Sequence, residues 1–300
     1  MMLSVVILTH NSGDHIRFCL DSVFDQDAGE REVVVVDNAS SDGTKELIKK
    51  NYTGVRLIEN PGNYGASKAR NQGIEASSGE WVLSLDSDVV LDKDFLKNFT
   101  RAAATLESTM GMIQPNVLKA DGRKVYSHGI RLTVFRRFYD LHRGKPQACR
   151  SEDEKKIIGP CSAAAFYRRD MLERLKENTG YFDERFFFLV EDVDLAWRAR
   201  RAGWRTKFCP ELVCFHAGNG SNTNIAARRY LCFRNRRLMI KKNENFFKRL
   251  CLHILTAPYE IVRLLRILIS GECRMIKLKK HKKLLLPSQE RNRDWEIKEF

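Results

Sequence analysis

Two aspartates separated by one residue follow an apolar run in WVLSLDSDVVLD, residues 81–92. Trp81 to Leu85 is typical of a buried strand, and buried strands rarely carry acids unless a positive group pairs with them. In an extended chain this spacing places Asp86 and Asp88 on one face. Two such carboxylates repel each other, and a hard divalent cation such as Mg²⁺ or Mn²⁺ relieves the repulsion. The stretch therefore predicts a metal site, with an acid-rich turn as the alternative.

A second group of carboxylates follows the aromatic run of FFFLVEDVDLAW, at Glu191, Asp192 and Asp194. A carboxylate beside an apolar wall has a pKa high enough to accept a proton, so it suits a general base. The alternative is that these acids favour the positive end of a helix dipole in its first turn.

Two further segments could bind a nucleotide. Asp37 ends the apolar run of VVVVDNASSDGT, where an acid can accept a hydrogen bond from a nucleobase or a ribose, or can serve a turn. The loop NPGNYGASKARNQG, residues 60–73, opens a helix with Lys68 and Arg70, which suits a diphosphate or a solvated surface. No GxGxxG follows the first strand, which argues against an NAD-binding fold.

His216, in CFHAGNGS, is a further candidate ligand. It would complete a metal site if its loop folds back onto Asp86 and Asp88. A single histidine is more often structural, so both readings stay open at this point.

Strands and helices alternate over the first hundred residues, with strands expected at 3–9, 32–38, 54–60 and 81–86 and helices near 14–25, 41–51 and 66–77. Near-continuous apolar strands favour a parallel sheet covered by helices on both faces. Residues 119–156 predict a hairpin and a loop, and a helix is expected over about 191–203. A short strand is expected at 205–210, and helices from residue 222 on.

Composition limits the classes of partner. The 300 residues are 43% hydrophobic and 30% charged, as in a globular enzyme, and the formal net charge is +14. Such a charge predicts attraction to nucleic acid, sugar nucleotides or a membrane surface. Residues 241–300 hold 15 lysines and arginines against 7 acids, and so carry more than half of the excess.

The C-terminal segment predicts a membrane contact. The apolar stretch 246–270 is interrupted by His253, Glu260, Arg263 and Arg266, so it suits a helix in the interface plane better than a spanning one. KLKKHKK, residues 277–283, adds a basic cluster, and a helical lid is the alternative. The opening MMLSVVILTHN is typical of a first strand, and the eight cysteines form no CxxC pair. We therefore expect a cytoplasmic chain, peripheral on the inner face of the cell membrane.

Taken in order, the motifs resemble a known family. They are VVILTHNSGDHIRFCLDSV, EVVVVDNASSDGT, NPGNYGASKARNQGI, WVLSLDSDVVLD, GPCSAAAFYRRDML, GYFDERFFFLVEDVDLAWRARRAGW, HAGNGS and YLCFRNRRLMIKKN. Over residues 3–243 the chain is similar to the family 2 glycosyltransferases, most of all to the rhamnosyltransferase-like branch of cell-surface polysaccharide assembly. The resemblance implies an α/β GT-A fold: a Rossmann-like, mostly parallel sheet flanked by helices. We expect this catalytic domain over 1–220 and a basic helical extension over 221–300.

The resemblance also implies roles for single residues. Asp192 would be the catalytic base, and Asp86 and Asp88 would hold Mg²⁺ or Mn²⁺, with His216 as a third ligand and Asp86 shared with the ribose. The donor nucleotide would be bound by Thr9, Asn11 and Asp37 on the nucleoside side and by Asn63, Lys68 and Arg70 along the pocket.

These roles imply one inverting displacement. Asp192 would take the proton of an acceptor hydroxyl, which attacks the anomeric carbon of a nucleotide-diphosphate sugar, with rhamnose as a candidate sugar. The acceptor would be a cell-surface glycan or a polyprenyl-linked molecule, and no nucleic acid is expected.

Three other classes of protein are alternatives to a glycosyltransferase. A sugar-nucleotide nucleotidyltransferase would want a Gly/Arg/Lys-rich triphosphate loop after the first strand, where THNSGDH has one glycine and no lysine or arginine. A nucleic-acid-binding module would place aromatics among its cations, and a non-catalytic basic binding protein would not need the acids. Here the basic excess lies mostly in the tail, and the acids of both motifs are present.

Overall fold

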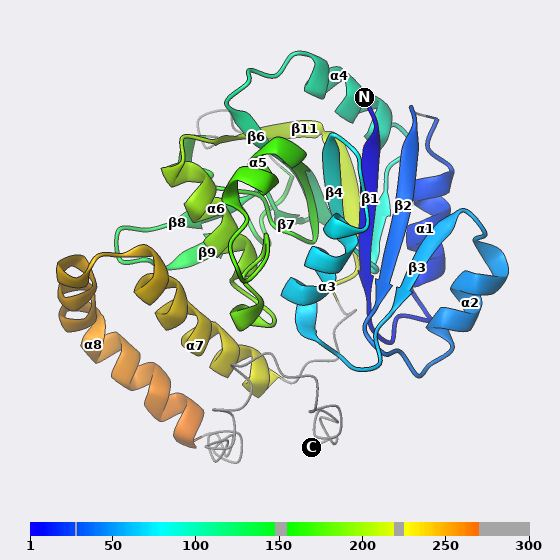
Figure 1. Ribbon diagram of the computed structural model, residues 1–300. Helices are drawn as coiled ribbons and strands as arrows, with labels where there is room; N and C mark the ends of the chain where they lie inside the picture. The colour runs from blue at the N-terminus through cyan, green and yellow to red at the C-terminus, as the bar shows by residue number, and fades with distance from the viewer. Residues whose placement is uncertain (28, 148–154, 219–224, 270–300) are drawn as a thin grey trace.

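The computed structural model describes residues 1–27, 29–147, 155–218 and 225–269 (Figure 1). Its strands are β1 Leu3–Thr9, β2 Arg31–Asp37, β3 Val55–Glu59, β4 Trp81–Asp86, β5 Val89–Leu91, β6 Met110–Lys119, β7 Val125–Ser127, β8 Ile130–Leu132, β9 Phe138–Asp140, β10 Ala164–Arg168 and β11 Arg205–His216. Its helices are α1 Ile16–Phe24, α2 Thr44–Asn51, α3 Gly65–Glu75, α4 Phe95–Ala104, α5 Arg169–Leu175, α6 Glu191–Arg201, α7 Ile225–Asn243 and α8 Phe246–Ile269, with a 3₁₀ turn η2 at Glu184–Phe186. The early strands and helices lie where the sequence predicts them.

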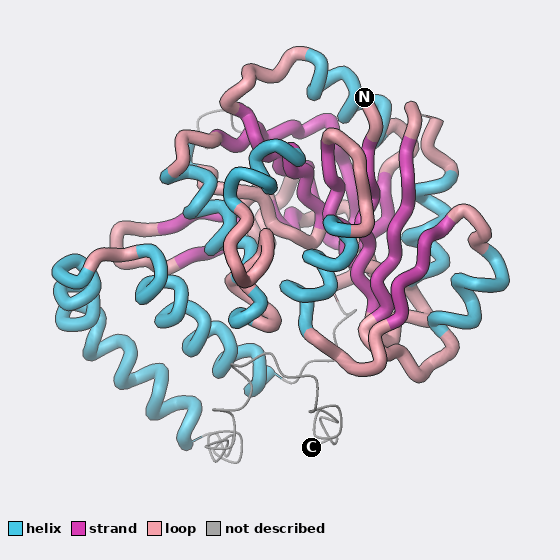
Figure 2. The backbone as a smooth tube through the Cα atoms, in the orientation of Figure 1, coloured by secondary structure: helices cyan, strands magenta, loops and turns pink. Residues whose placement is uncertain are grey.

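One large twisted sheet forms the centre of the molecule (Figure 2). Its strand order is β3-β2-β1-β4-β10-β6-β11-β5, with β7 paired to β6. Strands β3, β2, β1 and β4 are all parallel. The predicted parallel sheet is confirmed in this half, and its carboxyl ends share one edge.

Helices cover both faces of the sheet, as predicted. Val5 and Ile7 of β1 pack in one core with α1, α2 and α4, whereas Val6 packs with α3, α5 and α6. This alternation follows from the two-residue period of a strand. At Gly73 a Cβ atom would collide with the side chain of Val6, so glycine lets α3 lie close on β1.

The second half of the sheet is mixed. Strand β10 runs antiparallel between β4 and β6, and β5 pairs antiparallel with β11. Strand β11 is one long strand, where the sequence predicted a short one. It stays paired with β6 across an irregularity between Cys209 and Val213, which accommodates Pro210.

The hairpin predicted within 119–156 is present as β8 and β9. Helices α7 and α8 follow the sheet and pack beside α6 and this hairpin (Figure 1). Trp197 of α6, Met239 of α7 and Leu252 of α8 share one apolar cluster. The boundary at residue 220 stays a prediction, and KLKKHKK lies outside the described residues.

Among the helices that the structure describes, none has the length and apolar character needed to cross a membrane. This agrees with the charged residues that interrupt the apolar stretch of α8.

Candidate active site

Three predicted site residues meet at the carboxyl edge of the parallel strands. Thr9 pairs in register with Asp37, and its neighbour Leu8 pairs with Asp86. The Thr9 hydroxyl and Asp37 Oδ1 are buried and have no hydrogen-bond partner within the described chain. Buried polar atoms are rarely left so, and each can receive a ligand group.

The other carboxylate oxygen of Asp37 accepts a hydrogen bond from the backbone. Asp37 Oδ2 accepts a hydrogen bond from the Ser40 N–H at 2.9 Å. Asn11, which has φ of 50°, accepts from the Ser41 N–H at 2.8 Å, and its own N–H donates to Ser40 Oγ at 2.8 Å. Asn11 therefore joins the loops after β1 and β2, and its contact with a nucleoside stays a prediction.

The start of α3 carries the next two predicted residues. Asn63 Oδ1 accepts from the Gly65 N–H at 3.0 Å, and the Lys68 ammonium lies 4.5 Å from the centroid of the Tyr64 ring. Gly65 has φ of 83°, and a Cβ atom there would meet Phe187 at 2.5 Å. Asn63 thus shapes the loop and Lys68 stays half-exposed at its rim, with nucleotide contact as a prediction for both.

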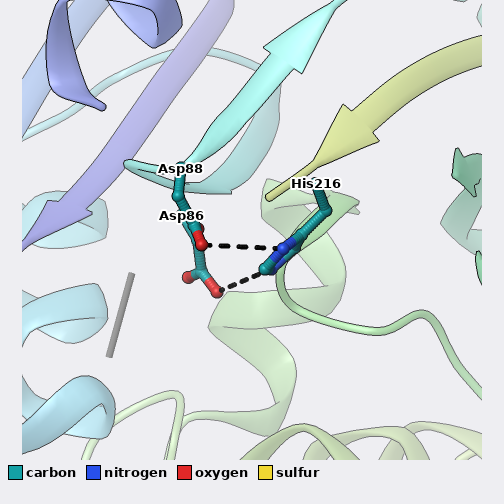
Figure 3. Close-up of side chains that lie close together, drawn as sticks. All are labelled: Asp86, Asp88 and His216. Carbon is teal, nitrogen blue, oxygen red and sulfur yellow. Dashed lines mark ion pairs between the residues drawn. The ribbon is translucent and has the colours of Figure 1, made fainter. Parts of the chain in front are cut away.

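Strand pairing brings His216 to the two aspartates. His216 ends β11 and pairs with Val89 of β5, and the Ala217 N–H donates to the Asp88 carbonyl at 3.0 Å. His216 Nδ1 lies 3.6 Å from Asp88 Oδ2, and Nε2 lies 3.9 Å from Asp86 Oδ2 (Figure 3). His216 thus lies near the two aspartates, as predicted. It does so because β11 pairs with β5, and not because its loop folds back.

This cluster fits a divalent cation. One ligand atom each from Asp86, Asp88 and His216 can be chosen so that all lie within 4.8 Å of one another. His216 Nδ1 is buried without a hydrogen bond in the described chain, and its ring stacks on Tyr126 with centroids 4.1 Å apart. Carboxylate oxygens with one imidazole suit Mn²⁺ and, less strongly, Mg²⁺.

Arg70 is the protein's own positive partner of this site. Its guanidinium donates to Asp86 Oδ1 and to Glu191 Oε1, each at 2.7 Å, and to Ser84 Oγ at 3.1 Å. Burial raises the pKa of Asp86, with Asp88 adding to the rise and Arg70 opposing it. Both of these ion pairs of Arg70 are therefore with acids of the protein, and a direct nucleotide contact stays a prediction.

Asp192 lies in the first turn of α6. Its Oδ2 accepts from the Ser162 N–H at 3.3 Å and its Oδ1 from the Val193 N–H at 2.8 Å. Burial, and then the charge of Glu191, raise the pKa of Asp192 to about 7. Its side chain keeps partial exposure, so a substrate could reach this carboxylate, and a pKa near neutral pH suits a general base.

One segment joins the two groups of acids. The Ala163 carbonyl accepts from the Asp86 N–H at 2.9 Å, while the neighbouring Ser162 contacts Asp192. Sequence reasoning did not single out Ser162, Tyr126 or the pairing of Glu191 with Arg70. Tyr126 lies in a region without a motif, so no signal pointed to it.

The chain is similar in sequence to proteins of one known family. Residues 4–176 match the family model Glycosyl transferase family 2. YibD of Escherichia coli, an uncharacterized glycosyltransferase, is 39% identical over 29% of this chain and 26% of its own length. The low-salt glycan biosynthesis hexosyltransferase Agl10 of Haloferax volcanii is 27% identical over 88% of this chain and 84% of its own length.

A third relative has a lipid-linked substrate in its name. The N-acetylglucosaminyl-diphospho-decaprenol L-rhamnosyltransferase of Mycobacterium tuberculosis is 27% identical over 72% of this chain and 76% of its own length. The aligned part thus spans most of two of these three relatives and about a quarter of YibD.

Solved GT-A glycosyltransferases share the fold. The mannosyltransferase PcManGT of Pyrobaculum calidifontis, in complex with GDP-Man and Mn²⁺, has a TM-score of 0.60 at 20% identity, over 95% of this chain and 81% of its own. TarS of S. aureus, in complex with UDP-GlcNAc, has a TM-score of 0.56 at 23% identity, over 84% and 72%. With a family match over more than half of its length, the chain belongs to glycosyl transferase family 2, and it is a glycosyltransferase with the GT-A fold.

Proposed function

We propose that this glycosyltransferase is metal-dependent and inverting, and that it moves a sugar from a nucleotide-diphosphate donor to a hydroxyl of a glycan or lipid-linked acceptor. The observation that carries the proposal is the cluster of Asp86, Asp88 and His216 at the end of the parallel strands. The raised pKa of the nearby Asp192 supports it.

The donor would lie along the carboxyl edge of the sheet. The unpaired Thr9 hydroxyl and Asp37 Oδ1 offer partners for the ribose and the base. Asn11, Asn63 and Lys68 would border the nucleotide, and Arg70 would act through Asp86. Mg²⁺ or Mn²⁺ held by Asp86, Asp88 and His216 would stabilise the negative charge of the departing diphosphate.

Asp192 would supply the general base. Its carboxylate accepts the proton of the acceptor hydroxyl, whose oxygen then attacks the anomeric carbon opposite the leaving group. A single displacement of this kind inverts the anomeric configuration and needs one base. The Ser162 N–H holds the Asp192 carboxylate in place during the transfer.

The acceptor class is supported by relatives. The mycobacterial relative is named for a decaprenol-linked acceptor and for transfer of L-rhamnose, so nucleotide-diphosphate rhamnose is the first donor sugar to test. A polyprenyl-linked acceptor would place the enzyme at the inner face of the cell membrane.

A donor panel tests this function. Purified chain would be given UDP-, GDP- and dTDP-sugars with Mn²⁺ or Mg²⁺, and release of nucleoside diphosphate would be measured. One nucleotide class should be turned over, and the metal chelator EDTA should stop it. Asp88→Ala and Asp192→Asn should each lower the rate about 10²-fold or more, because one loses an ion ligand and the other the base.

Glu107→Gln is the matched control, since Glu107 is an exposed carboxylate paired with Arg205. It should keep the wild-type rate. Undiminished turnover in both site variants would overturn the assignment of the site.

A further inference from the structure

Helix α8 turns a broad apolar side outward, and the narrow side that it buries mixes Leu252 and Ile267 with polar residues. Thr256 and Glu260 are buried, and Glu260 forms an ion pair with Arg236 of α7. On the opposite side Phe247, Ile254 and Ile261 are 76%, 65% and 56% exposed. A surface helix of a globular protein normally has the reverse orientation.

The outward side of α8 is a continuous apolar face with a basic edge. At about 100° per residue its exposed apolar side chains fall on one side of the helix. They include Phe247, Leu250, Ile254, Ile261, Val262 and Leu265. Lys248 and Arg266 are exposed and lie about five full turns apart, so both project from the same edge of this face.

The tip of the β8–β9 hairpin extends this surface. Val134 and Phe135 at the tip are 75% and 47% exposed. The Arg236 guanidinium donates to the Phe135 carbonyl at 2.6 Å while it pairs with Glu260, so it fixes the tip against α8. The Arg137 guanidinium lies 4.6 Å from the centroid of the Tyr259 ring of α8 and adds a cation at this junction.

We propose that the outward face of α8 and the hairpin tip 133–137 together form a docking surface for an anionic lipid bilayer. Apolar side chains flanked by lysine and arginine are what a helix in the interface plane presents to lipid. Glu260 is the one acid in the sequence of α8, and it is buried. The charged side chains on the exposed face of the helix are therefore all basic. A second copy of the chain would bring no acids from α8 to meet these cations.

This docking surface extends the proposed function, and its role in catalysis rests on that function. In Figure 1, α8 lies on the outer side of α7, away from the sheet. Docking through α8 would hold the enzyme at the bilayer that carries a polyprenyl-linked acceptor, while α7 connects this surface to α6 and Asp192.

Vesicle co-sedimentation of the full-length chain tests the proposal. The probes are vesicles of phosphatidylcholine alone and of phosphatidylcholine with phosphatidylglycerol. Wild-type chain should bind the anionic vesicles more tightly, and added salt should weaken this binding. Ile254→Ser with Ile261→Ser should weaken binding to anionic vesicles by at least about tenfold, because two apolar anchors are lost.

A further variant tests the contribution of the cations to binding, and a control variant tests whether the effects are specific to α8. Lys248→Gln with Arg266→Gln should weaken binding to anionic vesicles roughly tenfold and leave the weak binding to phosphatidylcholine unchanged. Ile225→Ser is the matched control, since Ile225 is 67% exposed at the start of α7 and lies outside the α8 face. It should bind like the wild type.

The proposal is overturned if wild-type chain stays in the supernatant, or if the Ile254/Ile261 variant binds as tightly as the wild type. It is also overturned if light scattering shows a dimer that this variant dissociates, because the face would then belong to a second copy. Asp88→Ala should bind vesicles normally, so a failed transferase assignment and a failed docking surface give different results.

Discussion

At the scale of single residues, Arg70 connects two acids that have different uses. It contacts Asp86 of the metal cluster and Glu191, the neighbour of Asp192. The buried Glu191 and the half-buried Asp86 lie near two further acids, Asp88 and Asp192. This concentration of negative charge would be costly without the guanidinium. The sequence predicted a basic residue near the nucleotide. It could not show the pairing, because Glu191 lies 121 positions further along the chain.

The raised pKa of Asp192 predicts a pH profile. The base acts only as the carboxylate, and its pKa is about 7, mainly because of burial and then because of Glu191. The value of kcat/KM should therefore rise about tenfold per pH unit below about 7 and level off above it. The measurement is initial-rate release of nucleoside diphosphate across pH at saturating metal. A flat profile through this range in the wild type would show that Asp192 is not the base.

At the scale of elements, the pairing of β5 with β11 brings His216 to Asp86 and Asp88, the candidate metal ligands. The apolar runs made most strands predictable, and the acids at their ends predicted an active site at the carboxyl edge of the sheet. The sequence left His216 open, because its place depends on a strand pair between segments far apart in the chain. The position of β10 between β4 and β6 could not be predicted from the sequence either. Strand order depends on tertiary packing and not on the local sequence pattern.

Helix α7 holds the backbone segment that precedes Asp192 in the sequence. Phe187, Leu189 and Val190 all have positive φ, which is costly for residues with a Cβ atom. The buried Asn235 amide donates to three carbonyls of this stretch, those of Phe186, Phe188 and Leu189, at 2.7–2.9 Å. Asn235 is thus a positioning residue for the start of α6.

Asn235→Ala should lower the free energy of unfolding by about 1–3 kcal/mol, because buried carbonyls lose their donor. It should also lower kcat, while Mn²⁺ affinity stays unchanged because its contacts lie away from the metal cluster. Urea unfolding, rates and Mn²⁺ titration measure the three effects. Asn51→Ala, at an exposed asparagine that bonds Leu47 in its own helix, should change stability by less than about 0.5 kcal/mol. Equal kcat in both variants would refute the positioning role.

At the scale of the whole molecule, one sheet gathers residues from far apart in the sequence into one site. The order of motifs was enough to indicate the family and the GT-A fold, and it predicted acids that the structure brings together. It did not indicate that α8 faces outward with its apolar side, because that depends on which polar groups α7 and the hairpin offer it. Arg236 supplies this contact by pairing with the buried Glu260.

We propose that β4, β5 and β11 bring Asp86, Asp88 and His216 together to hold one divalent ion. Electron paramagnetic resonance of Mn²⁺ bound to the full chain with a nucleoside diphosphate tests it directly. We expect one bound Mn²⁺ per chain with a nitrogen hyperfine coupling that His216→Ala removes, and at least about tenfold weaker Mn²⁺ binding in Asp88→Ala. Mn²⁺ binding with unchanged affinity and unchanged nitrogen coupling in these variants, or no Mn²⁺ binding by the wild type, would contradict it.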